Sequence, residues 1–116
     1  MSELEKVIFQ KFDDGIKEIQ NGKFIEGLRD VRLVLGSLWF LQENMDAAIV
    51  DMLLFVLEPR LKKLKDDKKF SKEFGEALKK IKEGFEKKDE LMIYRCAKET
   101  VSNVLKLAPT SEEEEE

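Results

Sequence analysis

Residues 33–57, LVLGSLWFLQENMDAAIVDMLLFVL, decide the fold of this chain. Two strongly apolar runs, 33–41 and 49–57, flank a short polar break at 42–44. Neither run reaches the ~18–20 uninterrupted apolar residues that a membrane-spanning helix needs, and acidic residues lie between and within them. A run of this length that is apolar on nearly every side is typical of a helix buried inside a protein. The sequence therefore predicts two adjacent buried helices joined by a short turn, and no membrane partner.

The rest of the chain shows the 3.6-residue periodicity of amphipathic helices and no strand alternation. Near the N-terminus, one apolar stripe follows the i, i+3, i+4 rule through Leu4, Val7, Ile8, Phe12, Ile16 and Ile19. Ser2 followed by Glu5 has the pattern of a capping box, so the first helix is expected to begin near Glu3. Asn21-Gly22 tolerates the positive φ angle found just after a helix end, and a second helix is expected over about 23–41.

Capping residues and prolines divide the second half of the chain. Three polar side chains suit the N-caps of the third, fourth and fifth helices: Asn44, Ser71 and Asp89. Pro59 lies within apolar spacing that continues through Leu61 and Leu64, which favours a kink over a new helix start. Residues 66–68 are expected to form a loop, and Pro109 is expected to end the last helix.

These elements predict an all-α protein, an antiparallel bundle of four to five helices. The 116 residues suit a single domain, taking roughly 150 residues per domain. The bundle is expected to occupy residues 1–109. Residues 110–116 contain no apolar side chain and end in five glutamates, a composition that predicts a disordered acidic tail because like charges repel and no core is available.

The composition excludes most catalytic chemistry. The chain has no histidine and a single cysteine, Cys96, so it lacks His-based general bases, Ser/His and Cys/His nucleophile pairs, and imidazole metal ligands. Cys96 is expected to be a half-buried structural thiol; the alternative is a reactive thiol whose pKa is lowered by Arg95 and Lys98 beside it. Acidic pairs such as Glu26/Asp30 are typical of solvated helix surface, and no glycine-rich phosphate loop is present. We therefore expect neither an enzyme nor a bound metal or cofactor.

Residue usage also indicates where the protein works. The first ten residues lack the basic-then-apolar build of a secretory signal, and one cysteine forbids an intramolecular disulfide, so a cytoplasmic location is expected. Asn and Gln occur three times each, whereas Lys and Glu are abundant. Few thermolabile amides together with many Lys and Glu indicate a thermophilic source.

Charge is segregated along the chain. The net charge of −4 divides into −5 over residues 1–59, +6 over 60–88 and −5 over 89–116. The densest basic part comprises Arg60, Lys62, Lys63, Lys65, Lys68, Lys69 and Lys72. It predicts an anion-binding surface for phosphates or for an acidic protein. The alternative is an ordinary solvated helix face, which is favoured because acidic residues such as Asp66 and Glu73 are interspersed and no aromatic stacking platform is free.

One interpretation links the glutamates at 112–116 to the basic segment at 60–72. Folded back onto the basic segment, they would mimic the anion that the segment binds; the alternative is that they only keep the chain soluble. The first interpretation predicts that removal of residues 111–116 strengthens binding of nucleic acid.

Asp51 stands inside the apolar run at 49–57. An unpaired carboxylate buried there costs several kcal/mol. We expect a structural ion pair with Arg29 or Arg32. The alternative is that the face carrying Asp51 is open to water or to a partner.

The two apolar runs hold more apolar surface than a five-helix chain readily buries. A core-facing stripe covers about 100° of a helix, whereas these runs are apolar nearly all round. The surplus is expected to form a partner-binding surface made of Leu38, Trp39, Phe40, Leu41, Leu53, Leu54 and Leu57. Self-association as a homodimer is the commonest way to bury such a surface, and a groove for a partner's amphipathic helix is another. A monomer that wraps both helices completely is the alternative.

The sequence thus predicts a non-catalytic helical interaction module, either dimeric or an accessory or chaperone-like subunit of a larger complex. The second-ranked function is an accessory subunit of a nucleic-acid-binding complex that uses the basic segment at 60–72, with the acidic tail as an anion mimic.

Overall fold

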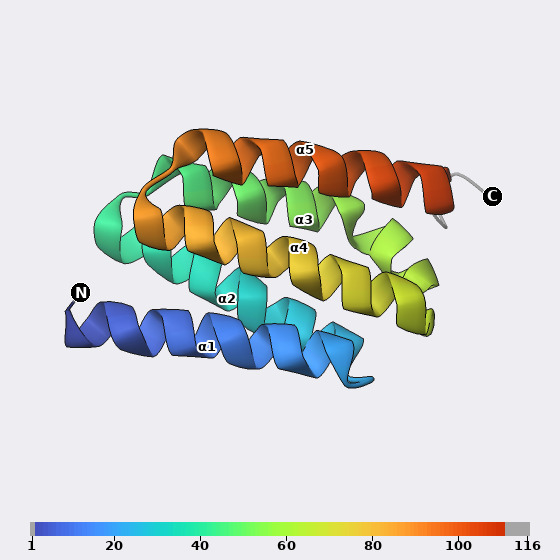
Figure 1. Cartoon of the computed structure of the whole chain (residues 1–116), viewed down its shortest axis with the longest axis horizontal. Helices are drawn as coiled ribbons and strands as arrows, with labels where there is room; N and C mark the ends of the chain where they lie inside the picture. The colour runs from blue at the N-terminus through green and yellow to red at the C-terminus, as the bar shows by residue number, and fades with distance from the viewer. Residues whose placement is uncertain (1, 111–116) are drawn as a thin grey trace.

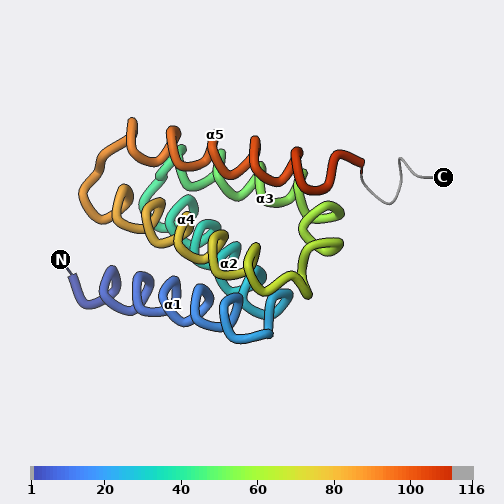
Figure 2. The backbone as a smooth tube through the Cα atoms, turned by 45° about the vertical axis from the view of Figure 1, so that its right-hand side comes forward, coloured from blue at the N-terminus to red at the C-terminus, as the bar shows by residue number. Residues whose placement is uncertain are grey.

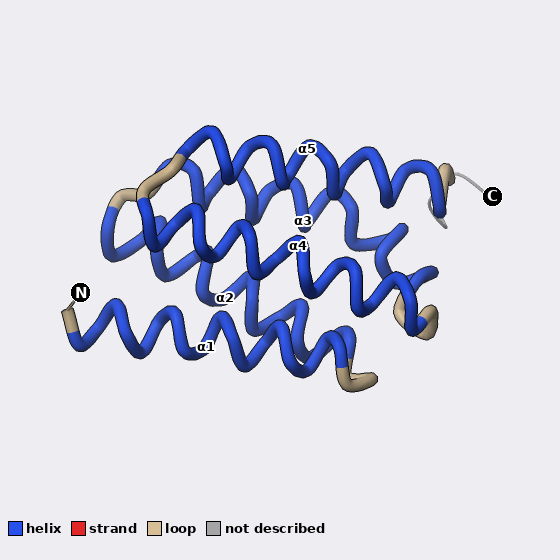
Figure 3. The backbone as a smooth tube through the Cα atoms, viewed as in Figure 1, coloured by secondary structure: helices blue, strands red, loops and turns tan. Residues whose placement is uncertain are grey.

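Each helix of the protein begins where a polar or turn-forming segment interrupts the apolar periodicity. Over residues 2–110, which are those that the computed structural model describes, the chain forms five helices joined by short turns (Figure 3). They are α1 (Glu3–Gln20), α2 (Phe24–Gln42), α3 (Met45–Leu64), α4 (Lys68–Lys87) and α5 (Glu90–Leu107). The predicted all-α class is confirmed.

Three of the predicted N-caps are confirmed. The Ser2 hydroxyl accepts a bond from the Glu5 N–H at 3.1 Å, and the Ser2 N–H donates to the Glu5 carboxylate at 3.3 Å, which completes the capping box. Asn44 and Asp89 each accept a bond from the N–H three residues further on. These bonds satisfy N–H groups that have no partner within the helix.

The predicted start of the fourth helix is wrong by one turn. Asp67, not Ser71, is the N-cap, and its carboxylate accepts a bond from the Phe70 N–H at 3.0 Å. An Asp is as good a cap as a Ser, and the earlier start places Phe70 on the helix surface that packs into the core. Ser71 is instead buried within the first two turns. The loop between α3 and α4 comprises residues 65–67, one position earlier than the predicted 66–68.

Consecutive helices run antiparallel, which confirms the predicted bundle (Figure 1). Helix α1 packs against α2 and α4, α2 packs also against α3, and α5 packs against α3 and α4. The five helices therefore form a closed ring of neighbours in the order α1, α2, α3, α5, α4. In Figure 1 the α2–α3 hairpin lies behind α4 and α5. The bundle measures 46 × 25 × 20 Å.

The core runs along the length of this ring. Its most completely buried side chains come from all five helices: Phe12, Ile16, Ile19, Leu28, Val31, Leu35, Leu38, Leu61, Phe70, Leu78, Ile81 and Ile93. At the start of α2, the Phe24 ring lies 5.6 Å from that of Phe74 and joins α2 to α4. Helices α1 and α2 cross closely at Gly15 and Gly27. The absence of a side chain on Gly27 permits this approach, since a Cβ there would overlap the carbonyl oxygen of Gly15.

Pro59 lies inside α3, which continues through it to Leu64. The proline has no N–H to donate to the preceding turn, and its ring crowds the carbonyl four residues earlier. The last turns of α3 bend away from its first part in both views of the backbone (Figures 1 and 2). The predicted kink is confirmed. Residues 111–116, which make up most of the predicted acidic tail, lie outside the described residues.

Candidate functional site

Helix α3 carries two apolar stripes on opposite sides. The inner stripe repeats every seven residues and is buried throughout: Ala47, Val50, Leu54, Leu57, Leu61 and Leu64. Spacing of three and four residues keeps these side chains on one face of the helix. This stripe supplies the part of the core that comes from α3.

The outer stripe of α3 has the same seven-residue repeat but faces solvent. It comprises Met45, Ala48, Ile49, Met52, Phe55, Val56 and Pro59, and none of these seven positions is charged. Met52, Phe55 and Val56 expose 63, 60 and 58% of their surface. Positions separated by three, four and seven residues form the seam that one helix presents to another. The outer stripe is therefore a helix-packing seam without a packed helix in the described chain.

Helix α2 extends this surface. Leu33 and Phe40 are exposed on the side of α2 that faces away from the core, and Gly36 lies between them with open space where a Cβ would stand. The Arg32 guanidinium of α2 lies 5.3 Å from the centre of the Phe55 ring of α3 and connects the two halves. We call the seven α3 residues together with Leu33, Gly36 and Phe40 the outer face.

One ion pair, Arg32–Asp51, borders the outer face. The Nε of Arg32 donates to the Asp51 carboxylate at 2.8 Å, and both side chains are about one-third exposed. The predicted structural pair is confirmed, with Arg32 rather than Arg29 as the partner. Because the two charges cancel across the α2–α3 contact, the apolar surface is not interrupted by a net charge.

The expected exposure of the surplus residues is partly wrong. Trp39, Phe40 and Leu41 are exposed as predicted, Phe40 by 82% of its surface. Leu38, Leu54 and Leu57 are at most 4% exposed and belong to the core, and Leu53 is half-buried. These leucines lie on the inner sides of α2 and α3, where antiparallel packing against α1, α4 and α5 covers them.

Sequence reasoning missed most of the outer face. Leu33, Met45, Ile49, Met52, Phe55 and Val56 were not among the predicted binding residues, although all are exposed. The seven-residue repeat at 45, 52 and 59, with 48 and 55 beside it, is a signal that would have found them. It distinguishes two seams on one helix, whereas total apolar content does not.

The outer face is large for a single chain. Taking about 200 Å² for a fully exposed large apolar side chain, the exposed fractions of Leu33, Phe40, Met45, Ile49, Met52, Phe55 and Val56 amount to roughly 840 Å². The largest apolar patch on a typical monomer is about 300–600 Å². The surface is close to the roughly 800 Å² that each partner contributes to a stable protein–protein interface.

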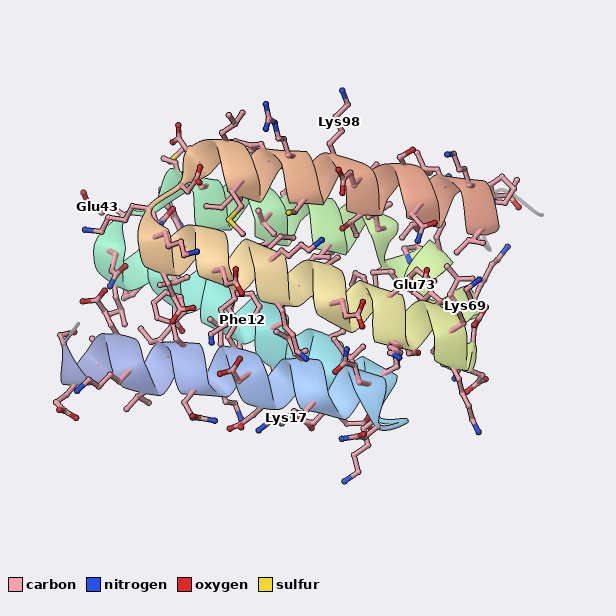
Figure 4. All side chains as sticks on the ribbon, viewed as in Figure 1. Phe12, Lys17, Glu43, Lys69, Glu73 and Lys98 are labelled. Atoms are coloured by element: carbon pink, nitrogen blue, oxygen red, sulfur yellow. The ribbon has the colours of Figure 1, made fainter. Side chains whose placement is uncertain are left out.

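The basic segment at 60–72 does not form one continuous patch. Arg60, Lys62 and Lys63 lie on the last turns of α3, and the Lys63 ammonium donates to the carbonyl oxygen of Thr110 at 3.0 Å. Lys69 is exposed in the first turn of α4 at one end of the bundle (Figure 4). Only three of the seven predicted residues come together in a groove: Lys65, Lys68 and Lys72.

That groove, of about 630 Å³, lies where the α1–α2 turn meets α4. A fourth lysine, Lys79, lines it together with Gln20, and the Gln20 amide donates to the Lys72 carbonyl oxygen at 3.0 Å. Asp66 and Glu76 also line the groove. The spacing of Lys68, Lys72 and Lys79 on one helix face is the signal by which sequence reasoning would have included Lys79.

Cys96 has the properties of a structural thiol. It is half-buried in a groove between α4 and α5 that is also lined by Glu99 and Lys80. Burial raises the pKa of the Cys96 thiol, with a further contribution from the Glu99 carboxylate. The alternative of a reactive thiol with a pKa lowered by Arg95 and Lys98 is wrong: desolvation of the thiolate dominates, and the basic residue that opposes it is Lys80.

A second polar cluster joins α3 to α5. The Tyr94 hydroxyl donates a short hydrogen bond to the Asp46 carboxylate, and this bond together with burial raises the pKa of Tyr94 to about 12. Hydrogen bonding and repulsion between Asp46 and Glu90 raise the pKa of Glu90. Within residues 2–110, no group of three or more His, Cys, Asp or Glu side chains is arranged to hold a metal ion.

No protein-family model matches the chain, and comparisons with curated proteins and with solved structures found no significant match. No helix in the described part of the chain combines the length and apolar character needed to cross a membrane.

Proposed function

We propose that this chain is a non-catalytic protein-interaction module that binds another protein chain through the outer face of α2 and α3. The single observation that supports the proposal is the outer stripe of α3, which has the same seven-residue repeat as the buried inner stripe but is exposed. An exposed apolar face of this size, without a net charge, is favourable only when another surface covers it.

The proposal is tested by photo-crosslinking in the producing cells. A photoreactive amino acid replaces Met52 on the outer face or, as a control, Leu91 on α5, since these side chains are 63 and 59% exposed. We expect discrete protein adducts from position 52 and none in comparable yield from position 91, with mass spectrometry identifying each adduct as the same chain or another protein. Equal yields at the two positions would contradict the proposal.

A second candidate function is binding of nucleic acid as an accessory subunit, and the lysine-lined groove favours it. Lys65, Lys68, Lys72 and Lys79 line this groove. The first turn of α4 adds Lys69 beside Lys68, and the Asp67 carboxylate already caps this helix end, so the candidate depends on the lysine-lined groove alone.

Binding of a mixed-sequence oligonucleotide at several salt concentrations tests this second function. Three or four lysine–phosphate contacts give a slope of log K against log salt of about −3. The double variant K68E/K72E should abolish binding, whereas the control K98E, on the exposed side of α5 (Figure 4), should not. Binding without salt dependence, or binding that K98E weakens equally, excludes the groove.

The acidic tail enters this candidate through Lys63, whose bond to Thr110 fixes the last described residue of the chain beside the basic end of α3. If the glutamates act as an anion mimic, a chain ending at Thr110 binds the oligonucleotide more tightly than the full chain at low salt. Equal affinity of the two chains excludes this role of the tail.

A further inference from the structure

We infer that the occupant of the outer face is a second copy of this chain, with α3 packed antiparallel against α3 of the partner across a two-fold axis near Met52. This inference rests on the proposed function and specifies its partner. It follows from three properties of the outer face: its repeat, its area and the distribution of charge at its two ends.

The repeat suits pairing of two identical helices. A two-fold axis makes the same patch meet itself, so the patch must be complementary to its own copy. The outer stripe runs from Met45 to Pro59 with Met52 at its centre, and seven-residue spacing gives the same pattern in both directions. With the axis at Met52, Met45 lies opposite Pro59 of the partner subunit, and the small Ala48 lies opposite Val56 of the partner subunit.

The area is that of a stable dimer. The outer face exposes roughly 840 Å² of apolar side chain, and two such surfaces together bury close to the 1,600 Å² of a standard interface. Ala48 and Gly36 are small residues within a surface of larger side chains. Such positions allow the backbone of a neighbouring helix to approach without a clash.

Charge decides the direction of pairing. The chain leading into α3 carries the exposed Glu43, whereas the end of α3 carries Arg60, Lys62 and Lys63. Figure 4 shows Glu43 at one end of the bundle and Lys69 at the other. A parallel pair would oppose the basic ends of the two α3 helices, whereas an antiparallel pair places Glu43 near Lys62 of the partner subunit. Antiparallel helix dipoles also attract.

Light scattering after size exclusion gives the first test. We expect the purified full chain to have twice the 13.5 kDa mass of one chain. Replacement of Met52 by Glu places two like charges at the axis and should return the mass to that of one chain. The matched control Leu91→Glu, an equally exposed apolar residue on α5, should leave the dimer intact. Circular dichroism checks that both variants keep their helices.

Two outcomes overturn the inference. One is a wild-type chain that stays monomeric up to about 100 μM, since interfaces of this size associate at micromolar concentration or below. The other is a dimer that M52E and L91E affect equally. A monomer whose position 52 still crosslinks to a different protein in cells would refute the inference and support the proposed function. A monomer without such adducts would contradict both.

Disulfide trapping tests the antiparallel arrangement. In a chain carrying Cys96→Ala, the single variant M52C should crosslink to its own copy when oxidised glutathione accepts the two electrons. The control V56C should not, because its two introduced thiols would be separated along the helix axes by about 12 Å, at 1.5 Å per residue, and a disulfide bridges Cα atoms no more than about 7 Å apart. The double variant A48C/V56C should crosslink again. Equal trapping of M52C and V56C would overturn the antiparallel pairing.

Discussion

Arg32 of α2 contacts both Asp51 and Phe55 of α3. Its Nε donates a hydrogen bond to the Asp51 carboxylate at 2.8 Å, and its guanidinium lies 5.3 Å from the centre of the Phe55 ring. The guanidinium therefore neutralises Asp51 and at the same time packs on an aromatic ring of the outer face. One residue thus joins the two helices and keeps their shared surface free of net charge.

The Arg32–Asp51 pair should contribute measurably to folding. Both side chains are about 29% exposed, so screening is incomplete, and replacement of either residue by Ala leaves the other charge half-buried without its partner. We expect each single variant to lower the free energy of unfolding by about 1–2 kcal/mol. Urea unfolding of R32A, D51A and the double variant should give a coupling energy of about 1 kcal/mol. Additive single effects would contradict the prediction.

The hydroxyl of Tyr94 should ionise at an unusually high pH. It is the only tyrosine of the chain, so absorbance at the tyrosinate band reports on it alone. Its hydrogen bond to Asp46 raises the pKa to about 12, and the variant D46N should bring the midpoint back towards the ordinary value of about 10. A wild-type midpoint equal to that of D46N would refute the role of Asp46.

The same shift makes stability depend on pH. In the unfolded chain Tyr94 ionises near 10, whereas in the folded chain it stays protonated until about 12. The unfolded state therefore loses its proton first. The contribution of Tyr94 is fully present below pH ~10 and is lost as the pH rises to about 12. Urea unfolding at several alkaline pH values should show this loss in the wild type and a smaller one in Y94F.

Two glycines should respond to alanine in opposite directions. Gly36 lies inside α2 with nothing within 4 Å of an added Cβ, so G36A should stabilise the fold by about 0.5–1 kcal/mol through helix propensity. A Cβ on Gly27 overlaps Gly15 and Ile19, so G27A should destabilise it by about 1–3 kcal/mol. Thermal unfolding in the M52E background separates these effects from self-association. A destabilising G36A would contradict the open space described at this position.

Cys96 should react slowly. Burial raises the pKa of its thiol, so less thiolate is present at neutral pH than in an unfolded chain. The partial burial of the side chain also limits the approach of a reagent. A chromogenic disulfide reagent should modify it several-fold more slowly in buffer than in urea. Because the chain has one cysteine, the trace reports on Cys96 alone. Equal rates in the two solvents would show an exposed, unperturbed thiol.

Local signals in the sequence were sufficient for the helices. Ser2, Asn44 and Asp89 cap three helices as predicted, and Pro59 bends α3, because these effects depend on groups within a few residues of each other. The prediction failed at the start of α4, where Asp67 and Ser71 are both adequate caps. Only the packing of Phe70 into the core distinguishes them.

The candidate site depended on information that the sequence does not hold locally. By itself the sequence determined that 33–41 and 49–57 form helices, that Asp51 needs a basic partner, and that apolar surface exceeds what the core requires. Only the tertiary structure decided that Leu38, Leu54 and Leu57 face inward while Phe40, Met52 and Phe55 face outward. The physical reason is that a helix apolar on every side has no preferred buried face until α1, α4 and α5 pack against one side of it.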